Sequence, residues 1–73
     1  MVALLITDSS LGKRIAHYRK DRKLSQAELG AIIGIYNNYI SRIENGRIVP
    51  SILTLARLAA AFGVTIDELV GKS

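Results

Sequence analysis

The sequence predicts an all-α fold, a compact domain of five short helices. Apolar residues recur at helical spacing nearly throughout, no segment alternates over the length of a strand, and the chain has only one proline. A chain of 73 residues is expected to form one domain, which buries only about 60% of its unfolded surface. Because cysteine is absent, neither a disulfide nor a thiolate zinc site can reinforce this small core. Stability must therefore come from closely packed helices, with or without self-association.

The first helix is expected to follow Ser10 as its N-cap and to end near residues 22–24. Three residues one turn apart supply its apolar face: Leu11, Ile15 and Tyr18. Residues 1–9 before it are interpreted as an N-terminal arm, whose apolar opening MVALLI is too short for a signal-peptide core or a membrane span. The helical domain is expected at 10–71, with a tail at 72–73.

The next two helices are expected to meet at a short break around Gly34. Ser25 and Glu28, three residues later, form a capping box at the start of the second helix, and Gly34 is its left-handed stop. The third helix is expected over 36–45, with Gly46 beyond it. Two helices joined by so short a turn form a helix-turn-helix, in which the second helix enters the DNA major groove.

Seven positions in this segment match what a helix-turn-helix requires. Gly30 is small where two helix backbones must cross closely, and Gly34 favours the positive φ of the turn. The other five positions are all apolar: Leu29, Ile33, Ile35, Ile40 and Ile43. Chance would rarely satisfy all seven demands, so this pattern is a specific signal.

Two further helices complete the predicted domain. Ser51 can cap a fourth helix that ends at Gly63. Five residues are expected on its apolar side: Ile52, Leu55, Leu58, Ala59 and Phe62. Thr65 and Glu68 form a second capping box for a short last helix, IDELV.

The segments LSQAELGAIIG, YISRIENG and PSILTLARLA resemble the Cro/cI-type helix-turn-helix family, also called Xre-like regulators. The resemblance covers roughly residues 11–70. It implies a lambda-repressor-like five-helix domain that binds double-stranded operator DNA as a two-fold homodimer. Small members of the family include phage repressors, restriction-modification controller proteins and antitoxin-type autoregulators. The expected location is therefore the cytoplasm of a prokaryote, at the nucleoid, for a chromosomal or phage-encoded protein.

The resemblance also implies roles for individual residues. Positions expected to contact bases are Asn37, Asn38, Ser41 and Arg42. Positions expected to contact phosphates are Ser25, Gln26, Tyr39, Asn45, Arg47 and Arg19. In some relatives the positions of Arg19 and Glu44 form an ion pair between the first helix and the end of the third; the alternative is two independent surface charges worth less than about 1 kcal/mol.

Tyr36 departs from the family pattern, because Ser, Thr or Asp usually caps the third helix at this position. A tyrosine cannot cap in the usual way. Either Asn37 caps a helix that starts one residue later, or the amides at the start of the helix bind solvent or phosphate. If Asn37 is the cap, its side chain is occupied and reads no base.

The residue types on the third helix suit base recognition. Asparagine offers a donor and an acceptor that match the major-groove edge of adenine, and arginine can pair bidentately with guanine. The net charge is +4, and residues 13–23 hold six of the ten Lys and Arg residues. Such a basic block favours a polyanionic partner, although part of it is expected to be an ordinary solvated helix face.

Other functions fit the sequence less well. The main alternative is a protein-interaction module, such as an antitoxin-like partner-binding protein, but its third helix should then be apolar. Membrane binding by the basic helix would need an exposed apolar stripe. His17 is interpreted as a surface residue, and we expect no enzyme activity, metal, cofactor or small-molecule ligand. Three surfaces remain open for the homodimer: the arm, the 48–53 loop, and the residues after the fourth helix.

Overall fold

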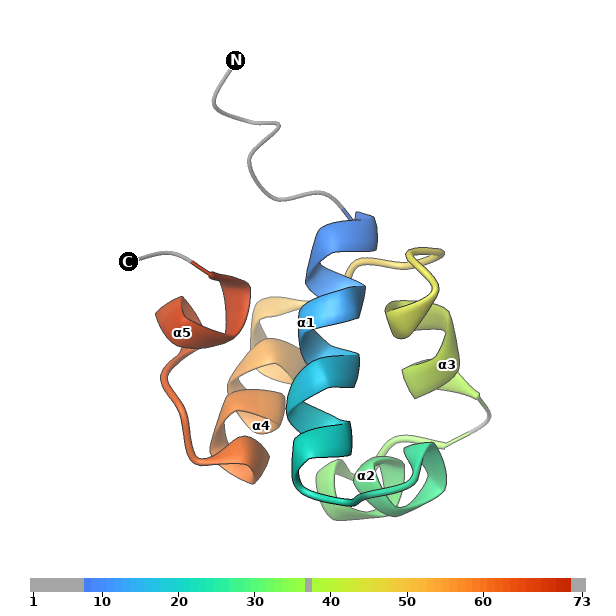
Figure 1. The fold of residues 1–73 in the computed structure, drawn as a ribbon. Coiled ribbons are helices and arrows are strands. Elements are labelled where there is room, and N and C mark those ends of the chain that lie inside the picture. Colours follow the sequence, from blue (N-terminus) through green and yellow to red (C-terminus); the bar gives the residue numbers. More distant parts are fainter. Residues whose placement is uncertain (1–7, 37, 72–73) are drawn as a thin grey trace.

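A computed structural model describes residues 8–36 and 38–71, and these residues form five helices and no strand. The helices are α1 (Asp8–Asp21), α2 (Gln26–Ile33), α3 (Tyr39–Glu44), α4 (Ile52–Phe62) and α5 (Ile66–Val70). The predicted five-helix, all-α fold is confirmed. In Figure 1, α1 runs through the middle of the molecule, with α3 on one side, α4 and α5 on the other, and α2 across its C-terminal end.

A single apolar core joins all five helices. Its largest wholly buried side chains come one from each helix: Ile15, Leu29, Ile43, Leu58 and Leu69. Every helix therefore contributes to the same core, and displacing any one of them would open a cavity in it. This shared core explains how helices of only five to fourteen residues remain folded without a disulfide.

Most predicted helix ends are confirmed. Capping boxes are present at Ser25 with Glu28 and at Thr65 with Glu68. The Ser51 side chain accepts a hydrogen bond from the Thr54 amide at the start of α4. The glycines that follow α2 and α4 adopt the left-handed conformation, with φ of 76° and 74°.

Three expectations about the helices are wrong. Because α1 already begins at Asp8, Ser10 lies inside the helix rather than capping it, and the helix includes the last two residues assigned to the arm. The remaining arm residues and the 72–73 tail lie outside the described residues.

The third helix begins at Tyr39 because Asn38 adopts a left-handed φ of 64°, which an α-helix does not continue through. Ile52, expected on the apolar side of α4, is 72% exposed.

Gly12 allows α1 to pass directly against the end of α3. A Cβ atom at this position would collide with the Ile43 carbonyl oxygen and would lie 2.6 Å from that of Glu44. Both obstacles are backbone atoms, which no change of side-chain rotamer can move. The contact between these two helices therefore requires glycine, a demand that helical periodicity alone does not reveal.

We predict that Gly12→Ala lowers the unfolding free energy by about 2–3 kcal/mol, because the added methyl group forces α1 away from α3. Gly63→Ala is the matched control: its φ is positive, but nothing lies within 4 Å of the added carbon. Only the left-handed backbone is then strained, which costs about 1 kcal/mol. Urea unfolding of both variants measures the difference, and equal losses would contradict the close contact.

Candidate nucleic-acid interface

The short helix α3 has a buried side and an exposed polar side. Ile40 and Ile43 are buried in the core. Asn38, which precedes the helix, and Arg42 are exposed, and Ser41 is half-buried. Polar side chains therefore meet solvent at the start of α3, through Asn38, and in its last turn, through Arg42.

The N-cap of α3 is Asn38, so the predicted cap at Asn37 is wrong. The other alternative, that the amides at the start of the helix bind solvent or phosphate, stays a prediction. The backbone φ and ψ of Asn38 are 64° and 15°, and its side chain makes no capping hydrogen bond. The Asn38 amide is therefore not occupied by the helix and remains available to a base edge. Asn37 lies outside the described residues, so its base contact stays a prediction.

The C-terminal end of α3 holds two of the residues expected to meet phosphates. Asn45 is exposed and its Nδ2 donates to Ser41 Oγ over 3.3 Å. Arg47 is also exposed, and its backbone N–H donates to the Arg42 carbonyl over 2.9 Å. The chain beyond the helix is thus fixed by backbone hydrogen bonds, while the Arg47 guanidinium is left in solvent.

The first turn of α2 faces the start of α3 across a hollow of about 320 Å³. Gln26, Tyr39 and Ser41 are among the residues that line it. The backbone N–H of Ser25 donates to Glu28 Oε1 over 2.8 Å, and Ser25 Oγ accepts from the Glu28 N–H. Tyr39 is half-buried and packs against the core. The hollow therefore brings residues expected to meet phosphates close to residues expected to meet bases.

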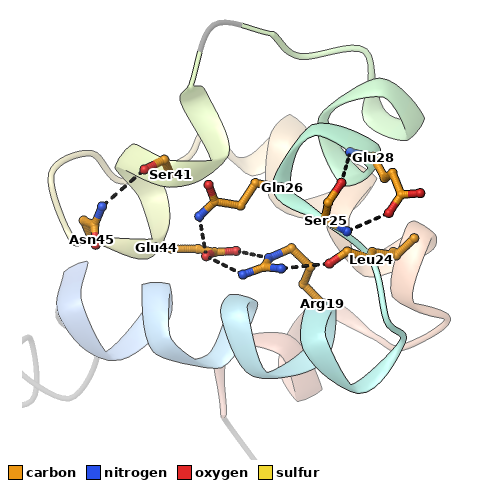
Figure 2. A network of polar contacts seen from close by, with 8 residues as sticks. All are labelled: Arg19, Leu24, Ser25, Gln26, Glu28, Ser41, Glu44 and Asn45. Atoms are coloured by element: carbon orange, nitrogen blue, oxygen red, sulfur yellow. Dashed lines mark hydrogen bonds and ion pairs between the residues drawn. The ribbon is translucent and has the colours of Figure 1, made fainter.

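A polar network centred on Glu44 ties α1, α2 and α3 together (Figure 2). Arg19 Nε lies 2.6 Å from Glu44 Oε2, and the two side chains are only 10% and 7% exposed. A second bond runs from Arg19 Nη2 to Glu44 Oε1 over 3.1 Å. Gln26 Nε2 donates to the same oxygen over 2.9 Å. Glu44 is thus the acceptor through which two other helices hold the end of α3.

The hydrogen bond and charge of Glu44 raise the pKa of Arg19, and burial opposes the shift. A raised folded-state pKa stabilises the protein at every pH below the unfolded pKa of the group. That stabilisation is lost only when the pH rises through the guanidinium pKa, which requires strongly alkaline solution. Arg19 therefore keeps the positive charge that the ion pair needs at every pH below the strongly alkaline range.

The expected phosphate contact of Arg19 needs correction. Besides its two bonds to Glu44, Arg19 donates through Nη1 to the Leu24 carbonyl over 2.8 Å. All three guanidinium nitrogens are therefore bonded inside the protein, and the residue is only 9% exposed. Arg19 therefore holds the end of α3 against α1, and none of its guanidinium nitrogens is left without a partner in the protein.

Two other arginines of the basic block also bind the protein itself. Arg14 Nε donates to the Leu69 carbonyl, and Arg22 Nε donates to the Phe62 carbonyl, each over 2.9 Å. The Arg22 guanidinium also lies 5.2 Å from the centre of the Tyr18 ring. Sequence analysis missed these roles, although Arg14 and Arg22 flank Tyr18 at a spacing of four and so border the apolar stripe. The lysines of the block are exposed: Lys13, Lys20 and Lys23.

Residues 8–36 and 38–71 contain neither a membrane-spanning helix nor a cluster of metal ligands. No helix there is long and apolar enough to cross a bilayer. In the same part of the chain, no group of three His, Cys, Asp or Glu side chains is placed to hold a metal ion.

Residues 15–69 match the protein family described as helix-turn-helix. The chain belongs to this family. It is 36% identical over 63 residues to the immunity repressor protein of Bacillus phage phi105, a match that covers 86% of this chain and 44% of the repressor. The chain thus spans less than half the length of that relative.

Solved structures share the whole fold. The P22 c2 repressor, crystallised with a synthetic operator, is 33% identical with a TM-score of 0.79, over 86% of this chain and 96% of that one. The restriction-modification controller protein C.AhdI from Aeromonas hydrophila is 27% identical with a TM-score of 0.81, over 85% and 94% of the two chains. The resemblance to this family inferred from the sequence is confirmed.

We predict that Glu44→Ala lowers the unfolding free energy by about 3–5 kcal/mol, because it leaves the Arg19 charge buried without its partner. Asp21→Ala is the matched control, since Asp21 is 68% exposed and lies 3.5 Å from Arg22. Such an exposed pair contributes less than about 1 kcal/mol. Thermal unfolding of both variants tests the difference, and a negligible shift for Glu44→Ala would remove the structural role of the network.

Proposed function

We propose that this protein is a transcriptional regulator that binds a specific, nearly palindromic operator as a homodimer, with α3 in the major groove. One observation carries the proposal: the polar side of α3 stands in solvent while its apolar side and Glu44 are anchored in the protein. A helix held in this way presents its side chains to a base edge in a fixed orientation. Its relatives include a phage repressor, and a neighbouring structure contains operator DNA.

Base recognition is assigned to the exposed side of α3. Arg42 offers the paired donors that match guanine, and Asn38 offers the donor and acceptor that match adenine. Ser41 can donate to or accept from either kind of base. Asn37, next to Asn38 in the sequence, is retained as a fourth candidate.

Phosphate binding is assigned to the two ends of the helix-turn-helix. At one end, the first turn of α2 carries amide groups without intrahelical partners, which suit an anion. Gln26 keeps one side-chain N–H beyond the one given to Glu44, and Ser25 and Tyr39 offer hydroxyl groups. At the other end lie Asn45 and Arg47. Contacts of this kind set the register on the duplex and supply most of the affinity.

The subunit contact is assigned to the segment that joins α3 to α4 together with the first turn of α4. Val49, Ile52 and Leu53 are 59%, 72% and 61% exposed. No residue of the stretch 48–56 is charged, whereas each chain carries a net charge of +4. Two such chains repel least where they meet through an uncharged, apolar surface. The competing residues after α4 are at least partly buried against the core: Val64, Ile66, Leu69 and Val70.

This regulatory role requires no catalysis, cofactor, membrane or small-molecule ligand. The alternative of a protein-interaction module would place a partner protein on α3 in place of DNA. Selection from random duplexes, followed by footprinting, separates the two. The proposal expects a selected sequence with two-fold symmetry and protected major grooves about 34 Å apart. Failure to enrich any sequence, with binding insensitive to salt, would overturn it.

We predict that Arg42→Ala and Arg47→Ala weaken DNA binding in different ways. Loss of Arg42 should cost about 1–3 kcal/mol per half-site and relax selectivity at one base pair. Loss of Arg47 should weaken all sequences alike and reduce the salt dependence by about one unit of slope per half-site. Binding isotherms on selected and unrelated duplexes, measured between about 50 and 200 mM salt, check both outcomes. Equal loss of selectivity in the two variants would contradict the assignment.

We predict that Leu53→Glu prevents two copies from meeting, because it places like charges on both sides of the contact. The affinity for the two-fold operator should fall at least about tenfold, while the circular dichroism spectrum stays unchanged because the residue is exposed. Ile32→Glu is the control: Ile32 is 58% exposed but borders Ala60 and Ala61, near the other end of α4. Equal effects of the two charges would exclude this subunit surface.

A further inference from the structure

We propose that Tyr36 recognises thymine, with its ring packed against the 5-methyl group of a thymine in the major groove. This inference rests on the proposed function and adds a specificity-determining residue to it. Tyr36 is the residue at which the chain departs from the capping residues usual in the family, and it does not cap α3.

Tyr36 lies in the turn between α2 and α3, on the surface assigned to DNA. It lines the hollow of about 320 Å³ between these helices. The same hollow is lined by Gln26, assigned to a phosphate, and by Asn38 and Ser41, assigned to bases. A duplex that contacts these three residues would therefore lie close to the tyrosine.

A packing role does not account for Tyr36. Tyr18 stacks on Phe62 with ring centres 5.5 Å apart, and Tyr39 is half-buried against the core. Tyr36, by contrast, is 70% exposed. Among the described residues it makes neither a hydrogen bond nor a ring contact. Of the three tyrosines in the chain, it is the one that presents its ring to solvent.

The chemistry of the DNA major groove indicates which group Tyr36 would contact. Base pairs present donors and acceptors along the major-groove edge, and the thymine methyl is the apolar group among them. An exposed aromatic ring beside polar side chains matches this mixture of one apolar group and several polar ones. The hollow that Tyr36 lines has the same mixed character, because polar residues (Gln26, Asn38 and Ser41) and apolar residues (Ala27, Ile35 and Ile40) both line it.

The test removes the methyl group from the DNA and the ring from the protein, separately and together. On a duplex selected with the unaltered protein, each thymine is replaced in turn by deoxyuridine and the Kd is measured. At one thymine per half-site, we expect about a threefold to fivefold loss of affinity, the effect of one buried methyl group. Tyr36→Ala should bind the thymine duplex more weakly and should lose nothing further at that deoxyuridine. Tyr36→Phe should behave as the unaltered protein in both respects.

Two controls make the result decisive. Ile32→Ala changes an exposed apolar residue away from the hollow and should leave the whole deoxyuridine profile unchanged. The thermal midpoints of the variants should agree within about 3 °C, because surface changes have little effect on stability.

The failures of the two proposals are distinguishable. If no sequence is selected, the regulator itself is excluded. If a sequence is selected but each deoxyuridine weakens Tyr36→Ala as much as the unaltered protein, Tyr36 does not read the methyl group. If Tyr36→Phe loses as much affinity as Tyr36→Ala, the hydroxyl group binds a phosphate and the thymine assignment is overturned.

Discussion

The position of α3 depends on the buried carboxylate of Glu44. A helix of six residues is too short to be stable alone, so its geometry must be imposed by the rest of the protein. Ile40 and Ile43 fix the side that faces the core, and Glu44 fixes its last turn through bonds to Arg19 and Gln26. Since Arg42 lies only two residues before Glu44, any shift of this network moves the proposed base-reading surface.

Helix α1 serves as the common support of the fold. Gly12 brings it against the end of α3, and Arg19 reaches the same region from two turns further along. On other faces of the helix, Arg14 and Arg22 donate to carbonyl groups at the C-terminal ends of α5 and α4. Helix C-termini carry partial negative charge, so cations suit these positions. Half of the basic block, Arg14, Arg19 and Arg22, therefore joins helices to one another.

Because these arginines bind the protein itself, other groups must supply the affinity for DNA. With three guanidinium groups bound internally, the phosphate-binding charge proposed here comes from Arg47 and the first turn of α2. The apolar segment with Val49 follows Arg47 almost directly. The proposed DNA and subunit surfaces are thus adjacent on one connection, and a change in how two copies meet would alter the separation of their recognition helices.

Local sequence signals by themselves determined the helices and their class. The serine, threonine and glycine residues that start and stop α2, α4 and α5 act through hydrogen bonds to their own neighbours, so their effect can be read without knowledge of the fold. The start of α1, at Asp8, and the turn between α2 and α3 were the exceptions. Asn38 takes a left-handed conformation in that turn, so α3 begins only at Tyr39. The neighbouring residues did not predict this start.

Only the tertiary structure decided which charges face inward. Arg14, Arg19 and Arg22 find their partners 25 to 55 residues away in the chain, and no periodicity reports so distant an acceptor. The requirement for glycine at residue 12 has the same origin, because the atoms that exclude a side chain belong to another helix. Short-range hydrogen bonds thus specified which segments form helices. Packing between those segments decided which polar groups stabilise the fold and which stay exposed to a ligand.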